Sequence, residues 1–208
     1  MLIIFDLDDT LIDTSGCITP RRLRSLVSDE ESYQELFFLN EACGSSQKAL
    51  IQFAERRRLD KEWLREAFEK LFEPLPEGVE ISLTLGAKEI LEWLSHSNHT
   101  VALVTGGNPS FQLEKLEKSR VNSFPFHSVA IAEDSNKKPY YQSLARAFGC
   151  SAREILVCGD RPAMDLLPAY ELGFRVFLRR WGRGLKVERE PWMDGEVWNL
   201  LELTKELA

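Results

Sequence analysis

Acidic residues crowd the amino-terminal segment MLIIFDLDDTLID, directly after a short apolar run. Asp6 and Asp8 come first, and Asp9 and Asp13 follow shortly after them. Positions two apart in an extended chain point to the same side, so Asp6 and Asp8 should present their carboxylates together. Two close carboxylates repel each other unless a cation or a shared proton offsets their charge. The segment therefore predicts acid chemistry or cation binding at the end of a buried strand.

Polar side chains recur at three further points of the chain, each beside the end of a predicted strand or the start of a predicted helix. They are a hydroxyl followed by two glycines, a pair of lysines, and a second pair of acids: Thr105, Gly106, Gly107, Lys137, Lys138, Asp160 and Asp165. In open α/β sheets the ligand site lies at the carboxyl ends of the strands. We therefore expect these side chains to meet the first acid pair at one edge of a sheet.

The elements that must position these clusters alternate between strand and helix patterns. Short apolar runs predict strands, and amphipathic segments between them predict helices. Such alternation is typical of a doubly wound parallel sheet with helices on both faces, an α/β fold. The expected strands cover 2–7, 100–104, 127–132, 154–159 and 174–179, and the expected helices cover 86–97, 109–119, 138–149, 162–173 and, in the tail, 196–207.

A purely helical block separates the first predicted strand from the others. Residues 32–44, 45–59 and 60–74 carry apolar side chains at helical spacing, with Gly44 as a helix stop and Asp60 as a cap. We therefore predict two domains, an α/β core over 1–15 and 80–208 and an inserted α-helical cap over 16–79. We expect the cap to cover the strand tips and to exclude water during reaction.

Bulk composition excludes several classes of protein. The 208 residues are 44% apolar and 28% charged, as in a soluble globular protein, and the net charge of −7 argues against nucleic acid as the main partner. The four cysteines form no C-x-x-C pair, which favours a reducing, cytoplasmic compartment. The amino terminus lacks a basic region, so we expect no signal peptide, and no run approaches the ~20 apolar residues of a membrane span.

The four clusters together resemble the haloacid dehalogenase superfamily, in its phosphatase branch with an α-helical cap (phosphoglycolate phosphatase-like). The first family motif, D-x-D-x-T, matches the opening acids, and a hydroxyl after a strand, a lysine often followed by proline, and G-D-x-x-x-x-D follow in the family's order. The matching residues are Asp6, Asp8, Thr10, Thr105, Lys138, Gly159, Asp160 and Asp165. The resemblance covers essentially the whole chain and implies a Rossmann-like core with an inserted cap.

The resemblance also implies a role for each matching residue. Asp6 would be the nucleophile that forms an aspartyl-phosphate, and Asp8 the general acid and base. Mg²⁺, a hard cation that prefers oxygen ligands, would be held by the Asp6 carboxylate, the Asp8 main-chain carbonyl and Asp160, with Asp165 as an indirect or water-mediated partner. The remaining residues would complete the metal and phosphate sites: Asp160 and Asp165 for the metal, and Thr105, Gly106 and Lys138 for the phosphoryl oxygens. Lys137 competes with its neighbour for the lysine role.

Several alternatives remain open at the level of sequence. Asp8 disfavours dehalogenase chemistry, because the dehalogenases of the superfamily lack the second acid of this motif. A phosphomutase uses the same core residues, and a receiver-like or catalytically silent phospho-accepting protein would share the acids, hydroxyl and lysine. The expected partner is a small phosphorylated metabolite, such as phosphoglycolate, a sugar phosphate or a nucleoside monophosphate. The loop at 179–184 is either a contact for a second anionic group or an ordinary basic loop.

Overall fold

The computed structural model describes residues 1–207, and the chain divides into two compact units. One unit comprises Met1–Thr14 and Val79–Ala208, and the other comprises Ser15–Gly78. The boundaries predicted from the sequence lie one residue later than these at each junction. The second unit is therefore an insertion, in sequence, between the first and second strands of the α/β unit.

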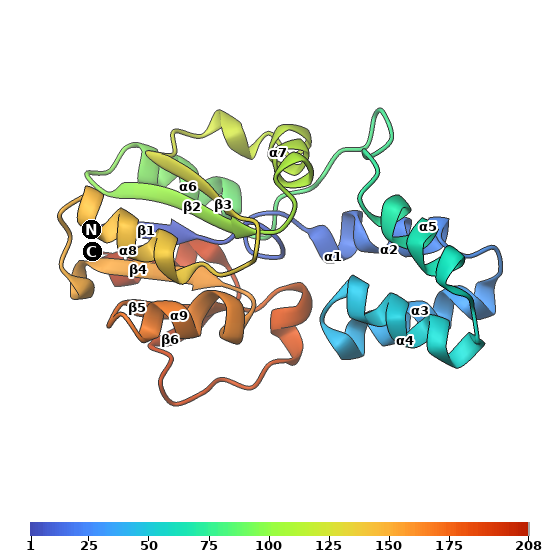
Figure 1. Ribbon diagram of the computed structural model, residues 1–208. Helices are drawn as coiled ribbons and strands as arrows, with labels where there is room; N and C mark the ends of the chain where they lie inside the picture. Colours follow the sequence, from blue (N-terminus) through green and yellow to red (C-terminus); the bar gives the residue numbers. More distant parts are fainter. Residues whose placement is uncertain (208) are drawn as a thin grey trace. The chain divides into compact units, whose positions relative to one another are not determined.

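The α/β unit is built on a six-stranded sheet in the order β3-β2-β1-β4-β5-β6, in which all pairings are parallel (Figure 1). Its central strand, β1 (Leu2–Phe5), is fully buried, which explains its uninterrupted apolar sequence. The predicted α/β fold is confirmed. The other strands are β2 (Thr100–Gly106), β3 (Ser128–Ala132), β4 (Ile155–Gly159), β5 (Arg175–Arg179) and β6 (Gly195–Val197).

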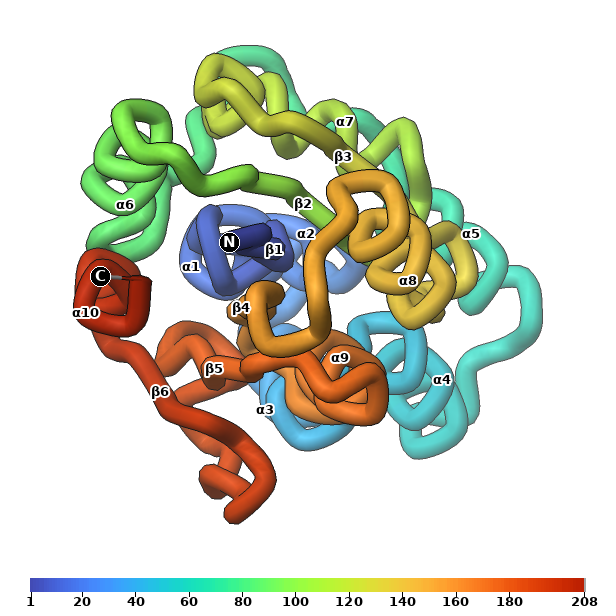
Figure 2. Tube along the Cα trace, turned by 90° about the vertical axis from the view of Figure 1, so that its left-hand side faces the viewer, coloured from blue at the N-terminus to red at the C-terminus, as the bar shows by residue number. Residues whose placement is uncertain are grey.

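Helices cover both faces of this sheet (Figure 2). On one face α8 (Lys138–Ala147) and α9 (Leu167–Tyr170) pack on the strands, with Tyr141 and Ala169 in one apolar cluster with Leu2 and Ile4. Figure 2 shows α6 and α10 on the opposite face. The remaining elements of this unit are α6 (Ala87–Ser95), α7 (Pro109–Lys118), α10 (Thr204–Leu207), the π-helical turn η3 (Pro162–Leu166) and the 3-10 turns η1 (Val121–Ser123), η2 (Ala152–Glu154), η4 (Gly182–Lys186) and η5 (Leu200–Leu203).

The tail departs from the single helix predicted over 196–207. It starts as the edge strand β6 and turns helical only from Leu200. Gly195 lets the tail lie close against the sheet, because a Cβ at this position would lie 2.5 Å from Cε1 of Phe177. The Asp194 amide also donates to the Val176 carbonyl at 3.0 Å, which starts the pairing with β5. Long-range pairing thus overrides the helical spacing of the apolar residues.

The inserted unit is all helical and has an apolar core of its own. Leu36, Leu50 and Phe53 are among its buried side chains. Gly44 ends one helix in the left-handed conformation, and the Asp60 side chain accepts from the Trp63 amide at 2.8 Å, so both predicted helix ends are confirmed. The helices are α1 (Thr14–Cys17), which begins at the junction, α2 (Thr19–Ser25), α3 (Glu30–Cys43), α4 (Ser46–Arg57) and α5 (Lys61–Leu71).

No helix formed by residues 1–207 combines the length and the apolar character that crossing a membrane requires.

A buried arginine ties the tail to the sheet. The Arg179 guanidinium is fully buried at the end of β5 and donates to the carbonyls of Leu85, at 2.9 Å, and Trp198. It also donates to the Val197 carbonyl at 3.3 Å. One cation therefore satisfies backbone acceptors from β6 and from the segment that precedes α6.

Replacing this arginine should destabilise the α/β unit. Arg179→Met removes a charged donor shared by the carbonyls of Leu85, Val197 and Trp198, of which Leu85 and Val197 keep a backbone amide donor. A hydrogen bond to a charged group contributes about 1.5–3 kcal/mol. We expect the free energy of unfolding in urea to fall by about 2 kcal/mol or more. Arg175→Met, which removes a partly exposed ion pair with Glu206, is the control and should cost about 1 kcal/mol or less. Equal effects of the two substitutions would contradict this account of Arg179.

Candidate active site

Three buried carboxylates meet at the carboxyl ends of two neighbouring strands. Asp6 follows β1, Asp160 follows β4, and Asp165 lies on η3. One carboxylate oxygen from each residue lies within 4.8 Å of the others. We call these residues the acid trio. The parallel pairing of β1 with β4 produces the juxtaposition, and the Asp6 amide continues that ladder by donating to the Cys158 carbonyl at 3.0 Å.

The third acid reaches the trio because of local backbone geometry that the sequence pattern did not predict. Pro162–Leu166 form a π-helical turn, where we expected the start of an ordinary helix. Asp165 packs directly on Gly159, since a Cβ at Gly159 would lie 2.5 Å from the Asp165 Cβ. The Arg161 amide donates to Asp165 Oδ2 at 2.9 Å. Gly159 is thus required for the close approach of Asp165 to β4.

The structure corrects the choice between the two adjacent lysines. Lys137 is fully buried, and its ammonium donates to Asp6 and, at 2.6 Å, to Asp165 Oδ1. Lys138 is 39% exposed on α8 and pairs with Glu171 at 2.6 Å. Lys137, and not the predicted Lys138, is therefore the lysine that lies beside the acid trio. The proline that follows it occupies the first turn of α8, and the residue before the helix is the one whose side chain enters the site.

The electrostatics of the trio follow from burial. Removal from water raises the pKa of Asp6 to about 6, with Lys137 opposing the shift and Asp165 adding to it. Burial also raises the pKa of Asp160, and the neighbouring Asp165 and Asp6 carboxylates raise it further. The Lys137 ammonium keeps a raised pKa despite its burial, because Asp165 and Asp6 stabilise its charge. The trio therefore carries more negative charge than its single buried lysine offsets.

The donor set of the trio suits a hard divalent cation. Asp160 Oδ1 is buried and has no hydrogen-bond partner among residues 1–207. Arg161 Nε lies 4.0 Å from this oxygen, too far for a hydrogen bond. Buried charges are normally paired or coordinate metals. Carboxylate oxygens grouped in this way match the ligand preference of Mg²⁺.

Asp8 lies outside the trio and has different partners. Its Oδ1 accepts from Thr14 and from the Lys115 ammonium at 2.7 Å, and its Oδ2 accepts from Gln112 Nε2 at 3.0 Å. Burial alone would raise the pKa of Asp8, but Lys115, with hydrogen bonds from Lys115, Thr14 and Gln112, lowers it to about 2. The predicted metal ligand at this position is the main-chain carbonyl of Asp8. Its side chain is hydrogen-bonded to Thr14, Gln112 and Lys115.

Sequence reasoning missed Gln112 and Lys115. The two residues are three apart on α7 and therefore share one helix face. In the sequence they are two polar positions in the amphipathic segment PSFQLEKLEKS, where such residues usually face water. Only the folded chain distinguishes Gln112 and Lys115 from Lys118 on the same helix, because Gln112 and Lys115 are buried beside Asp8.

Thr105 and Gly106 end β2 next to β1, as expected for strand-end residues. The Thr105 side chain is fully buried, and its hydroxyl has no hydrogen-bond partner in the described part of the chain. The Gly106 carbonyl accepts from Gln112 Nε2 at 2.9 Å, so Gln112 bridges this turn to Asp8. A buried hydroxyl left unpaired costs free energy unless something bonds it. Thr105 is therefore available to a ligand.

The basic loop at 179–184 has structural contacts. Arg179 holds backbone carbonyls, and Arg180 pairs with Glu196 while donating to the Gly184 carbonyl at 3.0 Å. Gly182 packs on Asp9, because a Cβ there would lie 2.4 Å from the Asp9 carboxyl carbon. Arg179 and Arg180 thus have their partners within the α/β unit.

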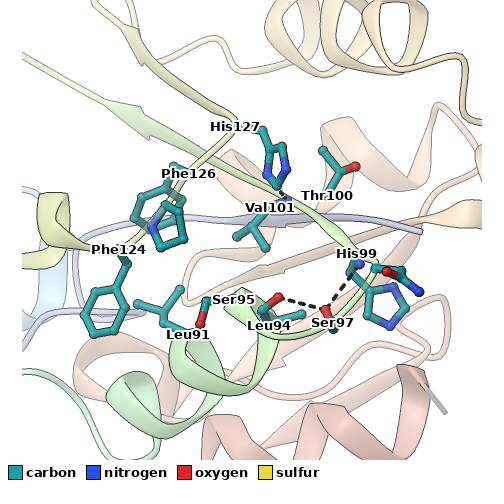
Figure 3. A pocket seen from close by; sticks show the side chains of 12 residues that line it. Leu91, Leu94, Ser95, Ser97, His99, Thr100, Val101, Phe124, Phe126 and His127 are labelled. Carbon is teal, nitrogen blue, oxygen red and sulfur yellow. Dashed lines mark hydrogen bonds between the residues drawn. The ribbon is translucent and has the colours of Figure 1, made fainter.

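A cavity of about 410 Å³ lies elsewhere on this unit (Figure 3). Its walls include Thr100 and Val101 at the start of β2, together with Phe124, Phe126 and His127. Thr105 and Gly106, at the opposite end of the same strand, border the acids. The cavity is therefore at the amino ends of the strands and is separate from the acid trio.

Comparisons with known proteins agree with this fold. A family model described as haloacid dehalogenase-like hydrolase matches residues 3–178. A Pyrococcus abyssi protein named glyceraldehyde 3-phosphate phosphatase is 28% identical, over 88% of this chain and 82% of its own. A predicted phosphoglycolate phosphatase from Haemophilus somnus superposes with a TM-score of 0.75 at 19% identity, covering 100% of this chain and 97% of its own. The HAD-type YfnB of Bacillus subtilis, whose structure is bound to magnesium, has a TM-score of 0.73 at 18% identity, with 99% and 97% covered.

Because the three carboxylates repel one another, removing the charge of Asp160 should stabilise the folded protein. Because the pKa of Asp160 is raised on folding, the folded state loses stability as the pH rises through that pKa. Asp160→Asn should therefore raise the melting temperature of the metal-free protein at pH 8, in EDTA. At pH 5, where Asp160 is closer to its neutral form, the difference should shrink. A variant that melts below the wild type at pH 8 would contradict the conclusion that burial and the neighbouring carboxylates outweigh the attraction between Asp160 and Arg161.

Proposed function

Because the chain belongs to the haloacid dehalogenase-like hydrolase family, we propose that it is a phosphatase acting on a small organic phosphate monoester. The observation that carries this proposal is the environment of Asp6. Its buried carboxylate is held between Thr10, at 3.4 Å, and the Lys137 ammonium, beside two further carboxylates. A carboxylate at the carboxyl end of a central strand, paired with a buried ammonium, can serve as the nucleophile toward a phosphoryl group.

Asp6 is the proposed nucleophile. One of its oxygens attacks phosphorus in line with the ester oxygen, the ester bond breaks, and an aspartyl-phosphate forms on Asp6. Water then attacks the same phosphorus, the acyl phosphate bond breaks, and inorganic phosphate leaves with Asp6 regenerated. The hydrogen bonds from Thr10 and Lys137 fix which way the carboxylate points during both steps.

Asp8 is the proposed carrier of the proton in both steps. Asp8 would have to take up a proton as the anionic substrate binds, since its pKa is low in the free protein. In the first step that proton passes to the departing alkoxide oxygen, and in the second the carboxylate takes a proton from the attacking water. Its presence favours a phosphate ester over a carbon–halogen bond as the substrate, since an alkoxide is a poor leaving group that needs this proton. Two acids two residues apart thus divide the nucleophilic and proton-transfer roles.

Lys137 and Thr105 are the residues proposed to hold the transferring phosphoryl group. The group carries negative charge on its equatorial oxygens, and a preorganised cation or hydrogen-bond donor stabilises that charge. Lys137 is a buried cation that touches Asp6, and Thr105 has a buried hydroxyl without a partner among residues 1–207. Gly106 is also a proposed phosphate contact, because it follows Thr105 at the end of β2.

Mg²⁺ is the proposed cofactor, held by Asp6, Asp160 and Asp165 together with the Asp8 main-chain carbonyl. Bound there, it would neutralise charge on the phosphoryl oxygens and on the acids themselves. The unpaired oxygen of Asp160 supports this assignment. The magnesium-bound protein from Bacillus subtilis shares the fold.

The proposed substrates are small phosphorylated metabolites. Proteins named glyceraldehyde 3-phosphate phosphatase from two Pyrococcus species, 28% and 26% identical to this chain, make that triose phosphate the first compound to test. Phosphoglycolate, sugar phosphates and nucleoside monophosphates complete the panel. Release of inorganic phosphate over many turnovers separates a phosphatase from a mutase or a protein that accepts phosphate once.

The nucleophile assignment predicts an inactive but folded variant. Asp6→Asn is nearly isosteric, so we expect turnover of p-nitrophenyl phosphate to fall about 10³-fold or more while the circular dichroism spectrum stays unchanged. The wild type should turn over repeatedly with Mg²⁺, stop in EDTA and recover when Mg²⁺ is restored. A variant that keeps a near wild-type rate would rule out Asp6 as the nucleophile, and full activity in EDTA would rule out the metal.

The two adjacent lysines offer a matched pair of variants. Lys137→Met removes the buried ammonium and should lower kcat/KM about 100-fold or more. Lys138→Met removes an exposed pair with Glu171 and should leave kcat/KM within about threefold of the wild type. The measurement is the initial rate with p-nitrophenyl phosphate at saturating Mg²⁺. The reverse order of effects would overturn the placement of Lys137 at the phosphate.

A further inference from the structure

Asp8 is held by side chains that the proposed mechanism does not yet use. Its two carboxyl oxygens together have four lone-pair sites. Oδ1 receives two donors, the Thr14 hydroxyl and the Lys115 ammonium, whereas Oδ2 receives only Gln112 Nε2. The donors therefore fill Oδ1 and leave one acceptor site open on Oδ2.

The Lys115 side chain is held in place beside Asp8. Its side chain is 5% exposed, and the ammonium lies 4.5 Å from the centre of the Phe111 ring while it pairs with Asp8 at 2.7 Å. The start of α7 is itself fixed, since the Asn108 side chain caps the Phe111 amide at 3.1 Å. A short ion pair between a capped helix and the turn after β1 restricts rotation of the Asp8 carboxyl group.

From this geometry we infer that Lys115 is a positioning residue, which turns Asp8 so that Oδ2 is the oxygen that exchanges the proton with the leaving group and with water. The inference rests on the proposed phosphatase function. Gln112 supports the same orientation, because its amide spans from Asp8 Oδ2 to the Gly106 carbonyl. Proton transfer requires donor and acceptor within hydrogen-bond reach, so a freely rotating Asp8 would transfer less efficiently.

The size of the effect should depend on the leaving group. A nitrophenolate leaves readily without a proton, whereas the alkoxide of glycerol 3-phosphate needs one. Misplacing Asp8 should therefore slow glycerol 3-phosphate far more than p-nitrophenyl phosphate. A loss of activity that leaves proton transfer by Asp8 intact would slow both substrates alike. The ratio of the two rates thus distinguishes a positioning role from a general loss of activity.

The experiment compares kcat/KM for p-nitrophenyl phosphate and glycerol 3-phosphate in the wild type and in Lys115→Met. This constant reports the steps through ester cleavage, so the hydrolysis of the aspartyl-phosphate, common to both substrates, does not enter. The ratio of the two constants is also independent of how much of the preparation is folded. We expect this ratio to rise about tenfold or more in Lys115→Met. Lys118→Met, on the same helix, is the control and should leave it unchanged.

Two further arms keep the test decisive. If Lys115→Met does not yield folded protein, Gln112→Leu removes the donor on Oδ2 and should raise the ratio in the same direction. A ratio that is unchanged, or that shifts in favour of glycerol 3-phosphate, in the folded variant overturns the positioning role. Absence of turnover by the wild type on any phosphate ester would instead be a failure of the proposed function.

Discussion

Repulsion among three buried carboxylates is the interaction on which the rest of the site depends. Asp6, Asp160 and Asp165 bring their oxygens within 4.8 Å of one another, away from water, and burial of like charges is costly. Lys137 offsets part of that cost by pairing with two of the three. The third, Asp160, keeps an unpaired oxygen among the described residues. A site built in this way favours any ligand that brings positive charge.

The two acids of the opening motif occupy opposite electrostatic environments although only one residue separates them. Burial raises the pKa of Asp6, whereas Lys115 and two hydrogen bonds outweigh burial at Asp8 and lower its pKa. The turn after β1 produces this separation, since the amides of Leu11 and Ile12 both donate to the Leu7 carbonyl, at 3.0 and 3.1 Å. The two carboxyl groups therefore differ in how readily each gives up its proton in the metal-free protein.

The sheet supplies the geometry that makes such a site possible. β1 lies between β2 and β4, so the loops that follow these three parallel strands are neighbours at the carboxyl end of the sheet. The strand order changes direction between β1 and β4, and ligand sites of open α/β sheets lie at such points. The remainder of the α/β unit supports that edge. Arg179 satisfies carbonyls of the tail, and Gly182 permits the loop after β5 to pack on Asp9. The family match over residues 3–178 includes all of these strands except β6.

The sequence by itself determined the α/β class, five of the six strands, the helical insertion and the acids of the site, because periodicity and strand-end chemistry are local properties. The tertiary structure alone decided which lysine enters the site, since Lys137 and Lys138 differ only in the direction each takes at the start of α8. It also decided the π-helical turn that carries Asp165, the strand in the tail, and the pairing of Lys115 with Asp8 across 107 residues. Each of these depends on packing between segments far apart in the chain, which no local pattern of residue types records.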